Sequence, residues 1–121
     1  MIAYNPGMEF PVRIEGDVAL IAPQGRVTIG ESAEAFARAV EAAFDGGARH
    51  ILVDCTKIPY ADSSGIGELL AAMRRARASE GRVALFGPRG KIHEVLEITQ
   101  LARYFLFGGT EEEARRLLTV G

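Results

Sequence analysis

The stretch "LVDCTKIPYADSSGIGELLAAMRR", residues 52–75, decides the fold. It begins inside the apolar run "HILVDC", whose branched side chains are typical of a strand buried on both faces. After a short loop, apolar residues recur at helical spacing until Gly81 ends the pattern. The stretch therefore predicts a buried strand, a loop and an amphipathic helix over residues 65–81. The inner stripe of this helix is predicted to consist of Ile66, Leu69, Leu70, Met73 and Ala76.

Toward the N-terminus, the sequence predicts a hairpin followed by a helix. Residues 10–25, "FPVRIEGDVALIAPQG", contain two apolar runs joined by a Gly-Asp dipeptide, which favours a tight turn between antiparallel strands. Residues 30–47 then show apolar positions at i, i+3, i+4 and i+7 and end at two glycines, which predicts a helix. Thr28 and Glu31 have the spacing of a capping box for its start.

Toward the C-terminus, strands and helices continue to alternate. "RVALFG", residues 82–87, predicts a strand, and residues 91–99 predict a helix with one apolar side. "RYFLF", residues 103–107, predicts a last short strand. Residues 110–120 predict a final helix, because Thr110 precedes a glutamate by three positions and thus forms a capping box.

Together these elements predict a single α/β domain with the order β-β-α-β-α-β-α-β-α. Strands that alternate with helices imply a mixed, mostly parallel sheet, with an antiparallel member near the start. We expect about four to five strands and about four helices. Residues 1–8 contain the breakers Pro6 and Gly7 and are expected to form a loose lead-in, so the domain itself should cover residues 9–121.

Composition narrows the classes of function. Hydrophobic residues make up 48% of the 121 residues, and the formal net charge is −2, so the chain lacks the basic excess of a nucleic-acid binder. No apolar run approaches the roughly 18–20 residues that span a bilayer, and the N-terminus does not resemble a signal peptide. The lone Cys55 and two distant histidines offer no disulfide and no metal ligand set. We expect a cytoplasmic domain without membrane insertion, metal or cofactor.

Four residues at the junction before the central helix, Asp62-Ser63-Ser64-Gly65, need an explanation. Asp and Ser are favoured N-cap residues because a side-chain oxygen accepts a hydrogen bond from a free backbone N–H. One cap needs only one residue, however, and neither serine is followed three positions later by the acid or amide of a capping box. Capping alone therefore does not account for the cluster.

Two enzyme-like alternatives fit poorly. "ADSSG", residues 61–65, approximates the G-x-S-x-G nucleophile elbow, but Ala61 replaces its first glycine and the only downstream histidine, His93, is predicted on a helix. A dinucleotide loop would need a third glycine where Leu70 stands. "GPRGK", residues 87–91, has too few residues between its glycines for a Walker loop. We therefore predict that the protein is not an enzyme.

Regulatory phosphorylation fits the junction better. A serine at a helix N-terminus lies on the surface, and the free N–H groups and helix dipole tolerate a phosphate there. Asp54 and Asp62 are close in sequence, so adding roughly −1.5 to −2 charges beside them would change the local potential sharply. The junction is therefore a candidate binding switch.

The region from "ILVDC" to "ARYF" resembles the STAS domain, and most closely the stand-alone bacterial anti-sigma factor antagonists. The early "PQGRVTIGESAEAF" resembles the first loop and helix of that family, so the resemblance covers roughly residues 10–119. The residues that carry it are Asp54, the D-S-S-G-I-G motif at residues 62–67, Gly81-Arg82, the segment Leu96 to Leu101, and Phe105.

This resemblance implies a small mixed sheet with packed helices and an activity without catalysis. The protein would bind a kinase-type anti-sigma factor, an anti-sigma factor serine kinase, and so free a sigma factor. The kinase would inactivate it by phosphorylating the serine after Asp62, which is Ser63. The partner-binding residues would be Asp62, Ser63, Ser64, Gly65, Ile66 and Gly67. In this interpretation Asp62 and Ser64 cap and shape the loop, and Gly65 lets the partner's backbone approach.

The resemblance leaves one alternative function open, and several other residues have plainer interpretations. The alternative is a STAS subunit of a larger complex, such as a lipid-transport ATPase, in which the loop is only a docking surface. We expect a monomer or weak dimer. Cys55 is predicted to be a buried structural thiol, His50 is predicted to be solvated, and His93 is predicted to lie at the surface of its helix, within reach of a partner. The exposed helix face with Arg74, Arg75 and Arg77 is interpreted as a solvated surface.

Overall fold

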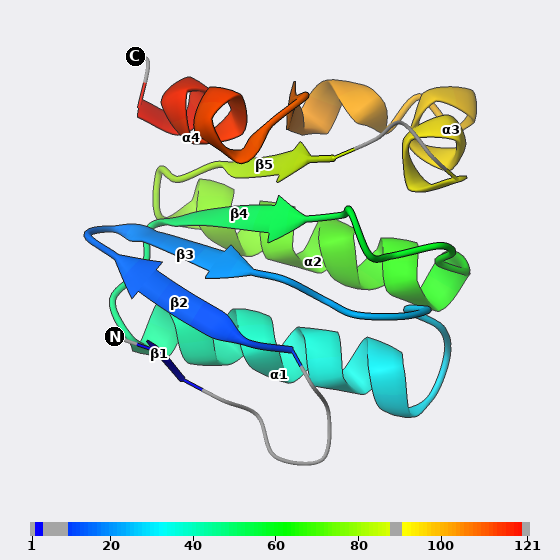
Figure 1. Cartoon of the computed structure of the whole chain (residues 1–121), viewed down its shortest axis with the longest axis horizontal. Coiled ribbons are helices and arrows are strands. Elements are labelled where there is room, and N and C mark those ends of the chain that lie inside the picture. The colour runs from blue at the N-terminus through cyan, green and yellow to red at the C-terminus, as the bar shows by residue number, and fades with distance from the viewer. Residues whose placement is uncertain (1, 4–9, 88–90, 120–121) are drawn as a thin grey trace.

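The computed structural model describes residues 2–3, 10–87 and 91–119, and Figure 1 shows the arrangement of their elements. The described elements are β1 (Ile2–Ala3), β2 (Val12–Glu15), β3 (Val18–Ile21), α1 (Glu31–Asp45), β4 (His50–Asp54), α2 (Ser63–Ala78), β5 (Val83–Phe86), α3 (Lys91–Ile98), the 3₁₀ turn η1 (Ala102–Tyr104), β6 (Leu106–Gly108) and α4 (Glu111–Thr119). From β2 onward, the predicted order of strands and α-helices is confirmed.

The strands form one mixed sheet in the order β1-β2-β3-β4-β5-β6. The β1–β2 and β2–β3 pairs are antiparallel, and the other neighbours are parallel, as the predicted βα units require (Figure 1). The predicted strands correspond to β2–β6. The two-residue β1 at the edge adds a sixth strand inside the segment predicted to be a loose lead-in. The rest of that lead-in lies outside the described residues.

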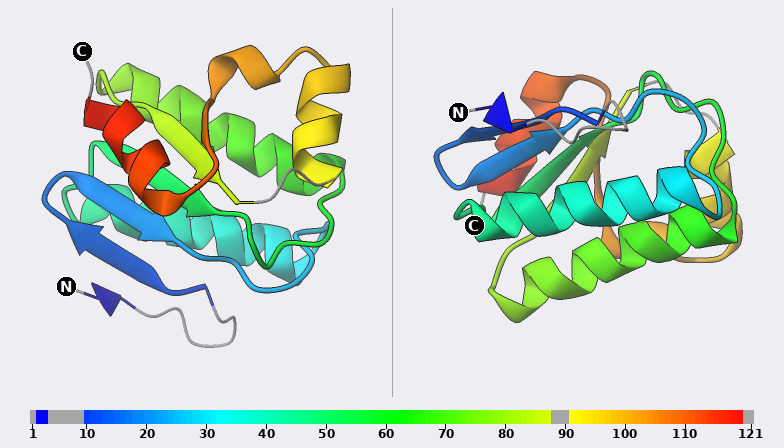
Figure 2. Two further views of the ribbon diagram at one scale, coloured as in Figure 1. Left: turned by 45° about the horizontal axis from the view of Figure 1, so that its top comes forward. Right: turned by 90° about the horizontal axis from the view of Figure 1, so that it is seen from below.

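Helices cover both faces of the sheet, and the strand residues alternate between two cores. In Figure 2, α1 and α2 lie on one face and α4 lies on the other. Ile21, Val53 and Leu85 point to the larger core under α1 and α2. Their neighbours Leu52 and Phe86 point to the smaller core under α4. This alternation is the period-two pattern of strands buried on both faces.

The two predicted capping boxes have different outcomes. At α1 the prediction is wrong, because the helix begins after Gly30 and no side chain within the described residues caps it. The Ser32 hydroxyl instead accepts a hydrogen bond from the Thr28 N–H (2.8 Å) and donates one to the Thr28 carbonyl (3.1 Å). At α4, Thr110 Oγ1 accepts a hydrogen bond from the Glu113 N–H at 3.1 Å, so the predicted cap is confirmed.

The bounds of two predicted elements differ from those in the structure. The helix predicted over residues 65–81 spans Ser63–Ala78, so both serines of the junction lie in its first turn. The strand predicted over residues 103–107 begins at Leu106, because Ala102–Tyr104 forms a 3₁₀ turn before it.

The prediction that His50 is solvated is wrong, and His93, predicted to lie at the surface, is only partly exposed. The side chain of His50 is 12% exposed, and its Nδ1 accepts a hydrogen bond from the Arg82 N–H at 3.0 Å. Burial lowers the pKa of His50, although the nearby Asp17 carboxylate acts in the opposite direction. His93 is 15% exposed and its ring packs edge-on against Phe107, with 4.6 Å between the ring centroids.

Candidate functional site

The junction forms the start of α2, and Asp62 is its N-cap. One carboxylate oxygen, Oδ1, accepts hydrogen bonds from the N–H groups of Ser64 and Gly65, both at 3.0 Å. The other oxygen, Oδ2, accepts a hydrogen bond from the N–H of Ile29 at 2.9 Å. These hydrogen bonds, first that from Ile29 and then that from Gly65, hold the pKa of the Asp62 carboxyl below its ordinary value.

Asp62 thereby joins two loops that are distant in sequence, residues 22–30 and residues 55–62. Backbone hydrogen bonds run between the same two loops, from the Gly25 N–H to the Lys57 carbonyl (2.9 Å) and from the Val27 N–H to the Tyr60 carbonyl (3.0 Å). Val27 also pairs with Ala61 in an isolated parallel bridge. The junction therefore rests on a hydrogen-bonded pair of loops.

Gly65 is required by the packing of this loop pair. Gly65 is buried, and a Cβ atom built on it would overlap the backbone carbonyl of Val27. The close approach for which a glycine is needed is therefore made within the chain. This corrects the expectation that Gly65 leaves space for a partner's backbone.

The six residues predicted to contact a partner differ in accessibility. Ser63 and Gly67 are exposed, whereas Asp62 and Ser64 are half-buried. Gly65 is buried, and the Ile66 side chain is only 6% exposed in the core. The prediction that Ser64 helps to cap the helix is also wrong, because its backbone N–H is one of the groups that Asp62 caps. Ser63 is the exposed hydroxyl of the pair.

Two large apolar side chains on the joined loops were missed by the sequence analysis. Ile29 is 77% exposed and Tyr60 is 41% exposed. Ile29 is held in place by its hydrogen bond to Asp62, and Tyr60 lies two positions before Asp62 in the chain. Their only signal in the sequence is that each stands outside any periodic apolar pattern. The structure adds them to the surface around Ser63.

Both histidines have partners within the described residues, and Nδ1 of His50 accepts a hydrogen bond from the Arg82 N–H. Nδ1 of His93 lies 2.7 Å from the Glu97 carboxylate. Burial raises the pKa of the Cys55 thiol to about 12, so the thiol stays protonated at neutral pH. Residues 10–87 and 91–119 also contain no group of three His, Cys, Asp or Glu side chains that could hold a metal ion.

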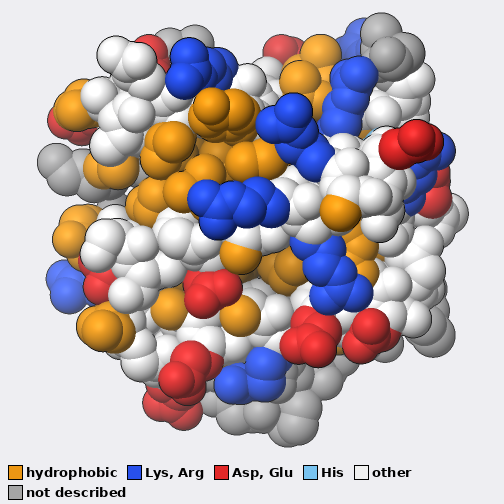
Figure 3. Space-filling model, turned by 180° about the vertical axis from the view of Figure 1, so that it is seen from behind, with side chains coloured by type: hydrophobic (Ala, Val, Ile, Leu, Met, Phe, Trp, Pro, Cys, Tyr) orange, Lys and Arg blue, Asp and Glu red, His pale blue; other side chains and the backbone are white. Residues whose placement is uncertain are grey.

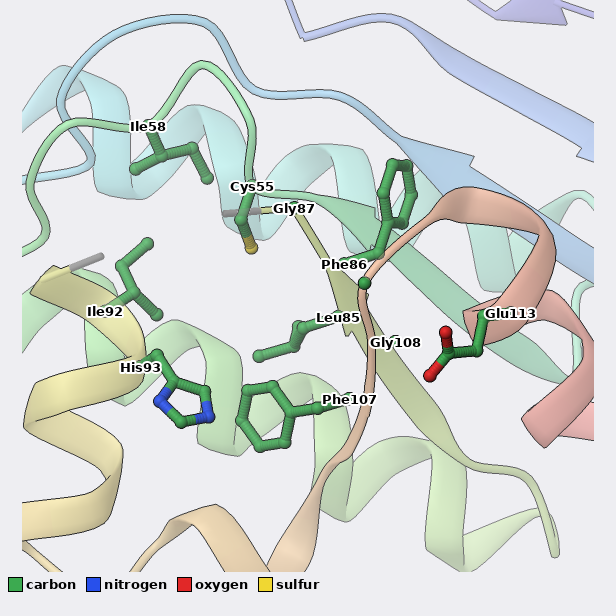
Figure 4. A pocket seen from close by; sticks show the side chains of 11 residues that line it. Cys55, Ile58, Leu85, Phe86, Gly87, Ile92, His93, Phe107, Gly108 and Glu113 are labelled. Atoms are coloured by element: carbon green, nitrogen blue, oxygen red, sulfur yellow. The ribbon is translucent and has the colours of Figure 1, made fainter. Parts of the chain in front are cut away.

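A separate pocket of about 190 Å³ lies beside the loop at residues 55–62 (Figure 4). It opens where β4, β5 and β6 end and is bounded by α3 and the start of α4. No local sequence pattern predicts this pocket, because its walls come from segments that are far apart in the chain.

The helix side of the molecule carries the predicted arginine face. Figure 3 looks onto this side and shows most basic side chains in its upper half, next to a group of apolar ones, and most acidic side chains lower down. Arg74, Arg75 and Arg77 are all exposed. The Arg75 guanidinium lies over the Phe44 ring, 4.8 Å from its centroid, and 3.8 Å from the Asp45 carboxylate. Exposed contacts of this kind are weak, in agreement with a solvated surface.

The family model described as "STAS domain" matches residues 9–114 of the chain. The chain belongs to the STAS domain family. A Thermotoga maritima relative, named as a candidate anti-sigma factor antagonist, is 30% identical over 88% of this chain and 98% of its own length. The STAS fold accounts for the antiparallel start, the parallel remainder and the two helical layers described above.

Solved structures share this architecture. The crystal structure of a Thermotoga maritima protein, also named as a candidate anti-sigma factor antagonist, is 27% identical with a TM-score of 0.82, covering 92% of this chain and 95% of that one. The phosphorylated form of the Bacillus cell fate determinant SpoIIAA is 24% identical, with a TM-score of 0.71, and covers 89% and 98% of the two chains. At that identity the second likeness shows the fold alone. Among the helices of residues 10–87 and 91–119, none combines the length and apolarity needed to cross a membrane.

Proposed function

We propose that this STAS domain is an anti-sigma factor antagonist that is switched off by phosphorylation of Ser63. In the unmodified state it binds a kinase-type anti-sigma factor in the cytoplasm, as a monomer or weak dimer, and so releases a sigma factor. The Thermotoga maritima relative named for this activity supports the proposal. The observation that carries it is the exposed Ser63 at the start of α2. Ser63 follows the N-cap Asp62, whose two carboxylate oxygens both accept hydrogen bonds from backbone N–H groups.

The geometry of the helix start favours Ser63 over Ser64 as the phosphate acceptor. Ser63 is the first residue of α2 and is exposed, so a kinase can approach its hydroxyl. Ser64 is half-buried, and its backbone is tied to Asp62. A phosphate on Ser63 would remain at the surface, where the positive end of the helix dipole tolerates it.

The same geometry makes a phosphate on Ser63 effective against binding while leaving the fold intact. The first turn of α2 has no acidic residue, and Asp62 provides the neighbouring negative charge. A phosphate adds roughly −1.5 to −2 charges to this surface. Because Ser63 contributes nothing to the core, the added charge and bulk act on the docked partner.

The exposed apolar side chains of the loop pair define the proposed docking surface. Ile29 and Tyr60 provide apolar anchors of the kind that contribute strongly to protein interfaces, and Ser63 and Gly67 lie on the same pair of loops and helix start. Asp62 and Gly65 support this surface from within, since both hold the loops together. In this proposal ATP binds to the partner kinase and not to this chain.

The matched pair Ser63→Ala and Ser64→Ala tests the site. The tagged protein is used to capture its partner from native lysate, the complex is incubated with ATP, and phosphate is located by mass spectrometry. We expect phosphate on Ser63 of the wild type, none on Ser63→Ala, and a normal yield on Ser64→Ala. Phosphate at a normal rate on Ser63→Ala would refute the assignment. Capture of transporter subunits with no phosphorylation would favour the docking role in a larger complex.

A further inference from the structure

The pocket beside the loop at residues 55–62 has an apolar interior. Its walls include Leu85 and Phe107 from the sheet, Ile92 and His93 from α3, and Cys55 and Ile58 from the loop. Figure 4 shows these side chains arranged around one common space. Side chains of this kind favour apolar ligands, because removing apolar surface from water is the main driving force for binding.

The size of the pocket suits a single aromatic ring system. Its volume is about 190 Å³. An apolar cavity of about 150 Å³ lined by leucine, isoleucine and phenylalanine stays dry and binds benzene. This pocket therefore has room for a molecule between benzene and indole in size.

The charges of the described lining residues disfavour an anionic ligand. The Glu113 carboxylate projects toward the space from α4 (Figure 4). Among the described lining residues there is no lysine or arginine, and Nδ1 of His93 is already paired with Glu97. Burial raises the pKa of Cys55 to about 12, so its thiol carries no charge at neutral pH. A carboxylate ligand would therefore meet the Glu113 carboxylate with no lysine or arginine among the described lining residues to offset it.

The pocket also shares a wall with the start of α2. Cys55, Ile58 and Ile92 line both this pocket and a much smaller void of about 10 Å³. The other side of that void is formed partly by Ala61 and Gly65, which flank the Ser63 junction. A molecule that displaces Ile58 thus acts on the loop that leads directly to Asp62.

We propose that this pocket binds a small, neutral aromatic molecule and that the loop at residues 55–62 transmits its occupancy to the start of α2. The binding itself is independent of the function proposed above. Its regulatory consequence, a change in how Ser63 is presented to a kinase, rests on that function.

Indole is the probe, and the whole chain is titrated with its isoleucine and leucine methyl groups labelled for NMR. We expect the methyl signals of Ile58, Leu85 and Ile92 to shift saturably, while that of Leu118 in the opposite core stays constant. The amide signals of Ser63 and Gly67 should shift with the same affinity. Absence of saturable methyl shifts would overturn the proposal. Methyl shifts without amide shifts would overturn only the transmission to α2.

A pair of variants and a charged probe sharpen this test. Ile58→Phe fills the pocket and should weaken indole binding at least about tenfold, whereas Ile14→Phe makes the same change at a half-buried position away from the pocket and should preserve it. Unchanged affinity in Ile58→Phe would contradict the location. On the wild type, benzoate should bind at least about tenfold more weakly than indole, and equal affinity would refute the selection for neutral ligands. The benzoate comparison needs no variant, so it holds even if Ile58→Phe fails to fold.

Discussion

The starts of α2 and α4 are both capped by a side chain, but the two caps have different reach. Thr110 accepts one hydrogen bond from the N–H of Glu113, within its own turn. Asp62 accepts two from its own turn and a third from Ile29, which is 33 positions earlier in the chain. The cap of α4 stabilises a helix end, whereas the cap of α2 also fixes a remote loop that carries an exposed apolar side chain.

The two helix starts also differ in charge, and this difference explains why a phosphate suits only one of them. The first turn of α4 contains three carboxylates, from Glu111, Glu112 and Glu113. The first turn of α2 contains none. A phosphate on Thr110 would add to three carboxylates in the first turn of α4, whereas one on Ser63 would meet no carboxylate in the first turn of α2 beyond the N-cap Asp62. The start of α2 therefore combines an exposed hydroxyl with a first turn that contains no acidic side chain to repel a phosphate.

The largest effect on the α2 start is expected from Gly65→Ala. The new methyl group overlaps the Val27 carbonyl, so the free energy of unfolding should fall by about 1–3 kcal/mol. The matched control is Gly67→Ala, two positions later, where a Cβ atom meets nothing within 4 Å. It should stabilise the protein by about 0.5–1 kcal/mol, because alanine is the better helix former. Urea unfolding measures both, and equal effects would contradict the close packing of the two loops.

The next effect compares the two caps directly. Thr110→Ala should lower the free energy of unfolding by about 1 kcal/mol, as expected for loss of an N-cap. Asp62→Ala should lower it further, because it also releases the Ile29 N–H. Hydrogen exchange at the Ile29 amide should accelerate in Asp62→Ala and stay unchanged in Thr110→Ala. If the Ile29 amide keeps its protection in Asp62→Ala, the carboxylate does not hold the remote loop.

The smallest effect is a pH dependence that only the α2 cap should show. The pKa of Asp62 is lower in the folded protein than its ordinary value of 3.8, because hydrogen bonds favour the carboxylate. Its contribution to stability is therefore complete above that ordinary value and is lost as the pH falls through the folded value. The stability difference between wild type and Asp62→Asn should shrink below pH 4, whereas that between wild type and Thr110→Ala should not. Urea unfolding at pH values from 7 to 3 measures these differences in the free energy of unfolding. A difference between wild type and Asp62→Asn that stays constant over this range would contradict the role given to the Asp62 carboxylate.

Local patterns were sufficient to predict the βα architecture and the Asp62 cap. The strands and helices from β2 onward carry clear apolar periodicity, and an acid directly before a helix is a local capping signal. The two-residue β1 was missed because it is too short to show a period. It exists only because β2 offers an edge to pair with.

The missed parts of the site depend on contacts between distant segments. Gly65 was interpreted as space for a partner because nothing near it in sequence reveals the Val27 carbonyl. The exposure of Ile29 follows from its tether to Asp62, which joins two loops. His93 was predicted to lie at the surface because the residue that covers its ring, Phe107, lies on a later strand. Each of these features requires the tertiary fold.

The affinity of the partner for the protein before and after phosphorylation of Ser63 tests the central claim most directly. The anti-sigma factor captured from lysate is titrated by calorimetry with unmodified protein, with protein phosphorylated at Ser63 and with Ser63→Asp, and circular dichroism monitors the fold. We predict that phosphorylation and Ser63→Asp each weaken binding by about tenfold or more, with spectra and melting near those of the unmodified protein. Undiminished affinity of the phosphorylated protein would contradict the switch, and loss of the fold together with binding would contradict its surface mechanism.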